Sequence, residues 1–360
     1  MESERFHIEV TDGLARIGWL ETKHGRVETP AFFPVHNIGA RSGWNTPRYW
    51  ELFPKINTVM LNAATFMMNR GDNRVQKVLS IGVHKYLNFD GVVFIDSGGF
   101  LCKKYGFYPK QEDLLILQQK LGADIASTLD YPISCRPLRD LDSVILTIKN
   151  AEQSLSCYNN SDMLLFASIQ GADALIIKNT IEYLKTRGAF NGFAIGSLMK
   201  KVNNYYLLVR LLLASRSSAG MLPLHVYGLS APLIILLLIY LGVDTFDSSF
   251  FMVASANRYY RILGGGKIHL RKLREYEPLP CSCTICTKYS AEDLRRNREL
   301  LALHNLWVLW QEIERAKKAI REGEFETYLR DRFSHHRYMS RVLTYAIHKV
   351  RMITISCNKK

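Results

Sequence analysis

The chain has 360 residues, 48% of them hydrophobic, and a formal net charge of +14. This length supports a large buried core, and a single α/β barrel commonly reaches about 250 residues or more. The longest apolar run, Ala231–Val243, is too short to span a bilayer, and the first residues lack the basic and apolar segments of a signal peptide. We therefore expect a cytoplasmic protein without a membrane partner.

The first thirty residues differ in pattern from the rest of the chain. Three segments, Phe6–Val10, Leu14–Leu20 and Gly25–Thr29, alternate in polarity and are separated by Asp-Gly and His-Gly pairs. Alternation broken by such turn residues is typical of a small antiparallel sheet. We expect this sheet in residues 1–30, ahead of the main domain.

Eight short apolar runs rich in β-branched residues follow, and segments with helical periodicity lie between most of them. The runs are Ala31–Val35, Ile56–Leu61, Gly91–Asp96, Asp124–Leu129, Met163–Ile169, Gly192–Ser197, Leu222–Leu229 and Asp244–Ser249. This alternation indicates a parallel sheet of the α/β class. Eight units are the number that closes a (β/α)8 TIM barrel, which we expect over residues 31–262, although periodicity alone also allows an open doubly wound sheet.

Polar residues occur at or just after the ends of six of these runs: Asp96, Asp130, Gln170, Ser197, Tyr227 and Asp247. In a barrel these ends meet at one face, where active sites are built. Each residue could instead cap a helix, since Asp and Ser are favoured there. Six such residues on successive units favour an active site.

The run Ala231–Val243 should form the helix before the last strand, and it shows no polar face. A helix that is apolar on all sides is buried. We expect it to pack either beneath the zinc-binding subdomain described below or in a homodimer interface.

Three cysteines, Cys281, Cys283 and Cys286, lie within six residues of one another. Three thiolates at this spacing can bind one tetrahedral zinc ion. His304, near the start of a helix expected from about Glu292 to Glu322, is the candidate fourth ligand, with His269 and Cys357 as alternatives. Four protein ligands would make the Zn2+ structural. We assign residues 263–325 to a zinc-binding subdomain and long helix.

The positive charge is concentrated in the last third of the chain. Residues 251–360 hold 22 Lys and Arg against 11 Asp and Glu. Beyond Tyr328 the only acidic residue is Asp331, against eight basic ones: Arg330, Arg332, Arg337, Arg341, Lys349, Arg351, Lys359 and Lys360. This basic tail, residues 326–360, either binds a nucleic-acid backbone or is a solvated helix face.

Several segments resemble the tRNA-guanine transglycosylase family, over about Phe6 to Phe325. The most specific are Glu28–Val35 (ETPAFFPV), Phe94–Phe100 (FIDSGGF), Thr245–Ser248 (TFDS) and Cys281–Cys286 (CSCTIC). Others are similar to the archaeal, archaeosine-forming branch: Leu20–Gly25 (LETKHG), Leu129–Pro132 (LDYP), Ala194–Ser197 (AIGS) and His304–Trp307 (HNLW). The family fold is a (β/α)8 barrel with an inserted zinc-binding subdomain, in agreement with the strand count.

The resemblance implies a role for each matching position. Asp247 would be the nucleophile at C1′ of the sugar, and Asp96 the acid/base residue that protonates the departing guanine. A second group would bind or stack on the base: Ser97, Phe100, Asp130, Gln170, Gly196, Ser197, Leu198 and Tyr227. Phe100 and Tyr227, taken singly, could equally be packing residues. Ser197 stands where bacterial members have a glycine.

The implied reaction exchanges guanine in a nucleic acid for a 7-deazaguanine (preQ0-like) through a covalent aspartyl-glycosyl intermediate. Because the chain ends before the further C-terminal domains of archaeal tRNA enzymes, we expect DNA as the polymer, as in the 7-deazaguanine DNA transglycosylases, and tRNA as the alternative. A non-catalytic nucleic-acid-binding subunit is a third possibility, against which both carboxylates argue. A homodimer or helper proteins stay open.

Overall fold

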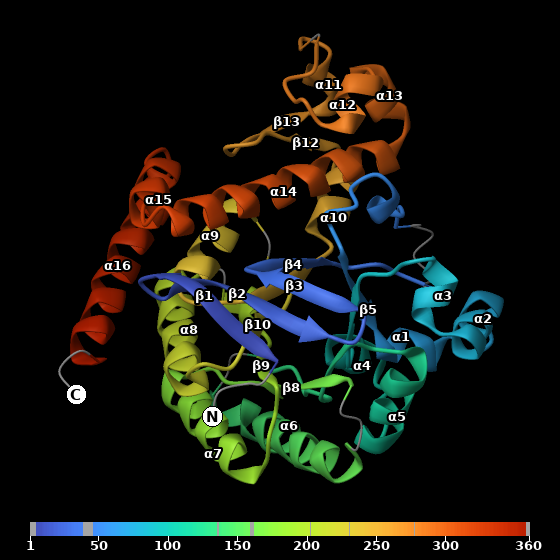
Figure 1. The fold of residues 1–360 in the computed structure, drawn as a ribbon, viewed down its shortest axis with the longest axis vertical. Helices are drawn as coiled ribbons and strands as arrows, with labels where there is room; N and C mark the ends of the chain where they lie inside the picture. Colours follow the sequence, from blue (N-terminus) through green and yellow to red (C-terminus); the bar gives the residue numbers. More distant parts are fainter. Residues whose placement is uncertain are drawn as a thin grey trace.

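A computed structural model describes residues 5–38, 46–134, 137–158, 162–201, 203–229, 231–276 and 278–357. Its centre is an eight-stranded parallel sheet surrounded by helices (Figure 1). The strands are β4 (Ala31–Pro34), β5 (Thr58–Asn62), β6 (Val92–Asp96), β7 (Ile125–Ser127), β8 (Leu164–Ile169), β9 (Gly192–Ile195), β10 (Leu224–Val226) and β11 (Thr245–Ser248). They fall within or overlap the eight expected runs.

The sheet closes on itself as a barrel. Its hydrogen-bonded order is β4-β11-β10-β9-β8-β7-β6-β5, so β4 and β5 are the two ends. A parallel bridge joins Val35 to Met60, and Thr58 Oγ1 donates to Phe32 O at 2.6 Å across the same seam. These contacts confirm the expected (β/α)8 class and exclude the open sheet.

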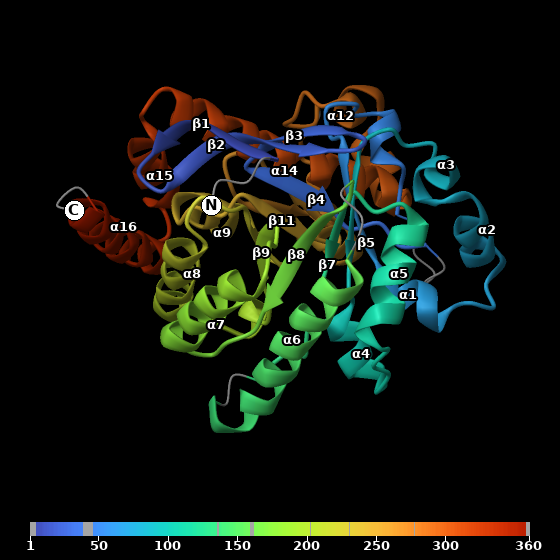
Figure 2. The ribbon, with the colours of Figure 1, turned by 60° about the horizontal axis from the view of Figure 1, so that its bottom comes forward.

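Helices cover the outside of the barrel, where they bury the outward-facing strand residues (Figures 1 and 2). They are α1 (Ala63–Met68), α2 (Asn73–Ile81), α3 (Val83–Leu87), α4 (Gly99–Tyr105), α5 (Gln111–Leu121), α6 (Pro137–Cys157), α7 (Ala174–Arg187), α8 (Tyr205–Ala219), α9 (Pro232–Tyr240) and α10 (Phe250–Ala256). Two short 3-10 helices, η1 (Tyr49–Glu51) and η2 (Leu198–Lys201), also follow strand ends.

The N-terminal strands β1 (Phe6–Asp12), β2 (Ala15–Thr22) and β3 (Gly25–Thr29) form the expected antiparallel sheet. Phe6, Leu20 and Val27 from this sheet share one buried cluster with the barrel-interior residues Phe94 and Phe166. The sheet therefore closes the N-terminal end of the barrel and leaves the opposite end for the polar residues.

A buried ion cluster joins this sheet to the barrel. Arg16 of β2 donates to both carboxylate oxygens of Asp244, at 2.6 and 2.8 Å, and Arg216 of α8 donates to Oδ2 at 3.0 Å. Leu224 N donates to the same Oδ2 at 2.7 Å. All three charged side chains are buried, so the charges are paired where water cannot solvate them.

The C-terminal region lies across the top of the barrel in Figure 1. It consists of β12 (Tyr259–Arg261), β13 (Lys267–His269), α11 (Leu270–Leu273), α12 (Thr284–Lys288), α13 (Ala291–Arg296), α14 (Arg298–Arg321), α15 (Phe325–Phe333) and α16 (Arg337–Cys357). The single long helix expected from Glu292 is wrong, because Asn297 is extended and its side chain accepts from Glu299 N and Leu300 N to cap α14.

The apolar helix α9 is covered within the chain. It packs against α14 and α15, and its residues Ile234–Tyr240 are buried. This confirms the first of the two expected placements, and the burial requires no second copy. Within the described ranges, no helix combines the length and apolarity needed to cross a bilayer.

Candidate functional site

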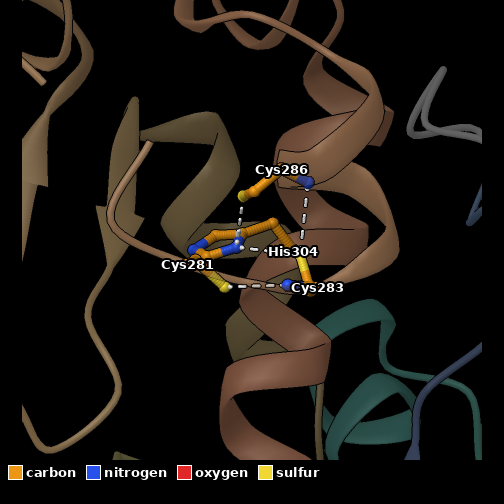
Figure 3. A group of neighbouring side chains, drawn as sticks. All are labelled: Cys281, Cys283, Cys286 and His304. Carbon is orange, nitrogen blue, oxygen red and sulfur yellow. Dashed lines mark hydrogen bonds between the residues drawn. The ribbon is translucent and has the colours of Figure 1, made fainter. Parts of the chain in front are cut away.

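The three cysteines and His304 converge on one point (Figure 3). Cys281 and Cys283 precede α12, Cys286 lies within it, and His304 projects from α14. The four ligand atoms lie within 4.8 Å of one another, and His304 Nδ1 is 3.6 Å from Cys283 Sγ and 3.3 Å from Cys286 Sγ. This group could hold a metal ion such as zinc.

The hydrogen bonds around His304 fit a metal-binding tautomer. His304 Nε2 lies 2.8 Å from the carbonyl oxygen of Arg261, so Nε2 must carry the proton and donate. The lone pair is then on Nδ1, which faces the sulfurs. Tyr260 stacks on the imidazole at 3.8 Å, and its hydroxyl lies 3.3 Å from Cys286 Sγ. Such outer contacts orient metal ligands.

Of the two alternative fourth ligands, His269 is not part of this group. His269 Nδ1 accepts from Arg271 N at 3.3 Å and caps α11. The side chain of Cys357 lies outside the described residues, as do Lys359 and Lys360. Three thiolates and one imidazole fill a tetrahedral zinc site and leave no open position, which is the arrangement of structural sites.

Asp96 is the last residue of β6, at the C-terminal end of the barrel strands, and its carboxylate accepts three hydrogen bonds. Asn62 Nδ2 and Gly98 N donate to Oδ2 at 3.3 and 3.1 Å, and Ser127 Oγ donates to Oδ1 at 3.2 Å. Burial raises the pKa of Asp96 to about 7, and the nearby charges of Asp130 and Asp247 add to the shift. Near neutral pH this carboxyl can therefore both give and take a proton.

Beside it, Asp130 and Gln170 form a buried polar pair. Gln170 Nε2 donates to Asp130 Oδ2 at 2.5 Å, and Ser97 Oγ donates to Asp130 Oδ1 at 3.3 Å. Burial raises the pKa of Asp130. The Gln170 Oε1 atom is buried without a hydrogen-bond partner in the described part of the chain. A buried acceptor of this kind calls for a donor from a ligand or from water, since an unpaired one costs about 1–3 kcal/mol.

Two glycines leave room for the side chains of Asp130 and Gln170. A side chain at Gly196 would overlap Gln170 Nε2, and one at Gly99 would overlap the Asp130 carboxylate. The residue after Gly196, Ser197, has a φ of 58°, in the left-handed region that favours glycine. Its hydroxyl compensates by accepting from Ile133 N at 3.1 Å, and Leu198 follows fully buried. The backbone at Gly196 therefore lies directly beside the Asp130 and Gln170 side chains.

The two carboxylate oxygens of Asp247, on β11, differ in their hydrogen bonds. Oδ1 lies 3.2 Å from His225 Nε2 and accepts from Gly228 N at 3.2 Å. No hydrogen bond reaches Oδ2 from any described residue. Thr245 Oγ1 lies 2.9 Å from His225 Nδ1. Because a carboxylate only accepts, His225 must donate through Nε2 and accept from Thr245 through Nδ1.

His225 was missed in the sequence. It is fully buried on β10, two residues before Tyr227, which directly follows that strand. The period of two in a strand places both on the same face, which was a signal that could have identified it. Its ring contacts those of Phe94 and Tyr227, with centroids at 4.8 and 4.7 Å.

The two predicted stacking residues differ in their surroundings. Phe100, on α4, is 67% exposed. Tyr227 points into the barrel, where its buried hydroxyl has no hydrogen-bond partner among the described residues. Burial, and then the charge of Asp96, raises the pKa of Tyr227 well above its usual value. The described structure shows no contact between the rings of Phe100 and Tyr227. If both rings stack on one flat ligand, the ligand lies between them.

Comparison with known proteins agrees with this geometry. Residues 11–338 match the family model described as queuine tRNA-ribosyltransferase. The chain is similar to tRNA-guanine(15) transglycosylases of Pyrococcus abyssi (29% identity over 92% of this chain and 57% of the relative), Haloferax volcanii (30%; 92% and 66%) and Aeropyrum pernix (31%; 94% and 66%). The chain thus spans between about half and two thirds of these relatives' length.

These comparisons correct the expected polymer. DNA was placed first because the chain ends before further C-terminal domains, but the similar proteins are all named for tRNA. The absence of a segment carries no information about which polymer the catalytic face accepts, so the DNA expectation was wrong. The family match itself, over nine tenths of the sequence, confirms the resemblance given by the motifs: the chain belongs to the queuine tRNA-ribosyltransferase family.

Proposed function

We propose that this chain is a tRNA-guanine transglycosylase, a pentosyltransferase that exchanges guanine in tRNA for a free 7-deazaguanine base. The observation that carries the proposal is Asp247, which holds one oxygen in two hydrogen bonds and leaves the other free. Its charge adds to the shift that raises the pKa of Asp96 to about 7.

In the first half-reaction, Asp247 Oδ2 attacks C1′ of the ribose while the C1′–N9 bond to guanine breaks. Asp96, in its protonated form, gives its proton to the departing base. A carboxylate suits the nucleophile's role because it is anionic at neutral pH and stabilises positive charge at C1′. The product is a covalent aspartyl-ribosyl intermediate and free guanine.

In the second half-reaction, the incoming 7-deazaguanine loses its N9 proton to the Asp96 carboxylate. Its N9 then attacks C1′, and the bond to Asp247 breaks. The proton given in the first step is thus recovered in the second. A carboxyl with a pKa near 7 can serve both steps with little energetic penalty.

Guanine is recognised by the buried pair Asp130 and Gln170, with Ser97 holding Asp130 in place. The Asp130 carboxylate and Gln170 Oε1 are acceptors for the N–H groups of a guanine edge, and the Gly196–Leu198 backbone borders the pocket. A base without those N–H groups would leave buried acceptors unpaired and bind poorly. Phe100 and Tyr227 supply aromatic surface for stacking.

The Cys281, Cys283, Cys286 and His304 group would hold one structural zinc ion. The ion would supply four bonds that join the α12 loop to α14. Its residues lie in the loop before α12, in α12 and in α14, on other elements than the carboxylates (Figure 3).

The test is incorporation of labelled guanine and labelled 7-deazaguanine into tRNA, with Asp247→Asn as the inactive variant and Asp113→Asn, a helix-surface change on α5, as the control. We expect exchange by the wild type and the control, and none by Asp247→Asn. Denaturing electrophoresis should show a protein–tRNA adduct with the wild type and with the control, but not with Asp247→Asn. Absence of exchange into tRNA by the folded wild type would refute the proposal and favour a non-catalytic subunit.

A further inference from the structure

We propose that the N-terminal half of α16 is a contact surface for the phosphate backbone of tRNA, built around Arg337 and Arg341. This inference rests on the proposed function. It concerns a helix that makes no contact with the carboxylates, and it can be tested separately from the chemistry.

The position of α16 relative to the catalytic face follows from its partner helix. It runs along α8 (Figure 2). Tyr338 contacts the rings of Tyr205 and Tyr206, at 5.9 and 6.1 Å, and those residues begin α8. Helix α8 begins just after η2, which starts with the pocket residue Leu198. The N-terminal end of α16 therefore lies at the same barrel face as the base pocket.

The far end of α16 points away from that face. Ile353 lines one cavity with Leu213 and Ser217, near the C-terminal end of α8. In a barrel, the helix that follows a strand begins at the catalytic face and ends at the opposite one. Only the first half of α16 is thus placed to meet a polymer bound over the carboxylates.

The exposed face of α16 is basic along that half. Arg337, Arg341, Thr344 and His348 are exposed and recur at helical spacing, whereas Val342, Leu343, Ala346 and Ile347 are buried. No acidic residue occurs anywhere from Arg332 to Lys360. The Cα atoms of Arg337 and Arg341 are separated by about 6 Å along the helix axis.

Ion pairs divide the basic residues of the tail into two groups. Arg330 and Arg351 both pair with Glu326, and Arg332 pairs with the buried Glu312. The Arg332 pair joins α15 to α14 and the Arg351 pair joins α16 to α15, whereas the Arg330 pair lies within α15. By contrast, no acidic side chain pairs with Arg337 or Arg341 in the part of the chain that the structure describes. The fold therefore leaves these two guanidinium groups for an external anion.

The chemistry of this surface fits an RNA backbone. Arginine binds phosphate through two parallel hydrogen bonds. Tyr338, 46% exposed between the two arginines, offers a face on which an unpaired base can stack. A carboxylate-rich protein partner would meet the same charges, but the placement beside the base pocket favours the substrate polymer.

The experiment compares the wild type with Arg337→Glu/Arg341→Glu, using unmodified tRNA between about 50 and 200 mM salt. The control, Lys77→Glu/Lys120→Glu, makes the same charge change on the exposed faces of α2 and α5, away from α16 in Figure 1. We expect the Kd for tRNA to rise roughly tenfold in the α16 variant, and the slope of log Kd against log salt to fall by about 1.5. The control should change both much less.

Exchange kinetics separate this inference from the proposed function. The α16 variant should show a raised KM for tRNA, with an unchanged KM for guanine and an unchanged kcat at saturating tRNA. Equal Kd and salt slope in the two double variants would overturn the inference while leaving the transglycosylase proposal intact. If the wild type is inactive but Arg337→Glu/Arg341→Glu still weakens tRNA binding, the transglycosylase proposal fails and the α16 contact surface stands. The neutral pair Arg337→Gln/Arg341→Gln, expected to show an intermediate Kd, guards against a folding defect.

Discussion

The Nε2 atom of His225 lies 3.2 Å from Oδ1 of Asp247, and this contact distinguishes the two oxygens of the proposed nucleophile. With the Gly228 N–H on the same atom, Oδ1 is fixed and Oδ2 is left to react. Thr245 Oγ1, on the other side of the imidazole, donates to Nδ1 when the Asp247 carboxylate holds the proton on Nε2. His225 thus acts as a positioning residue that works through Asp247.

Replacing His225 by Phe should lower kcat roughly 10- to 100-fold with little change in KM for tRNA, because a hydrogen bond to a charged group contributes about 1.5–3 kcal/mol. The measurement is kcat and KM for tRNA in the exchange assay, determined over a range of pH.

His225→Gln is the matched control, because its amide can still donate to Oδ1. It should recover part of the rate. If Gln and Phe lower kcat equally and neither changes the pH profile, the contact is structural packing and does not position the nucleophile.

The raised pKa of Asp96 predicts how activity depends on pH. Donation to the leaving guanine needs the protonated form, so kcat/KM for tRNA should fall as the pH rises through about 7. A profile that stays flat from pH 6 to 9, with chemistry rate-limiting, would contradict the acid role.

The same shift predicts a change in stability, measured by urea unfolding of the wild type and Asp96→Asn. The native state holds the Asp96 proton more tightly than the unfolded chain, whose carboxyl has a pKa of about 3.9. Raising the pH from 4 to 8 therefore destabilises the wild type relative to Asp96→Asn, and the difference should vanish below pH 4. Asn fits the site, because Ser127 Oγ can accept its N–H.

The Cys281, Cys283, Cys286 and His304 group predicts about one tightly bound zinc ion per chain, measured by elemental analysis. Cys283→Ser and chelation should both remove it and lower the Tm by several degrees, since binding of a structural zinc contributes directly to folding. Cys157→Ser, in a half-buried thiol on α6, is the control and should retain the metal. A wild type without bound metal after purification in zinc would disprove the site.

The buried cluster of Asp244 with Arg16 and Arg216 predicts a large loss of stability on a minimal change. Asp244→Asn keeps the shape but leaves two buried guanidinium groups without a counter-charge, which should cost about 3–5 kcal/mol in urea unfolding. Asp162→Asn removes an exposed partner of Lys23 and should change stability by less than about 1 kcal/mol. Comparable losses in the two variants would show that Asp244 is not the main link between the N-terminal sheet and the barrel.

Local patterns were sufficient for much of the fold and part of the site. Apolar runs alternating with helical periodicity gave all eight strands, because a strand covered on both faces must be apolar wherever it lies. The Cys281–Cys286 segment identified its own cluster, since three ligands in six residues need no distant partner. Asp96 and Asp247 were singled out because they lie at or near the ends of predicted strands, and the family resemblance implied their roles; Asp96 ends β6 and Asp247 is the last residue but one of β11.

Tertiary structure alone decided the rest. That His225 donates to Asp247, and that Glu312 and Glu326 pair with Arg332 and Arg351, depends on contacts between residues on different elements. Among the described residues, Arg337 and Arg341 have no acidic partner. The position of α9 beneath α14 was one of two options that its apolar sequence allowed. A sequence states directly which side chains are charged, and its local periodicity indicates which are buried. The partner of each charge is set by packing between segments that are distant in the chain.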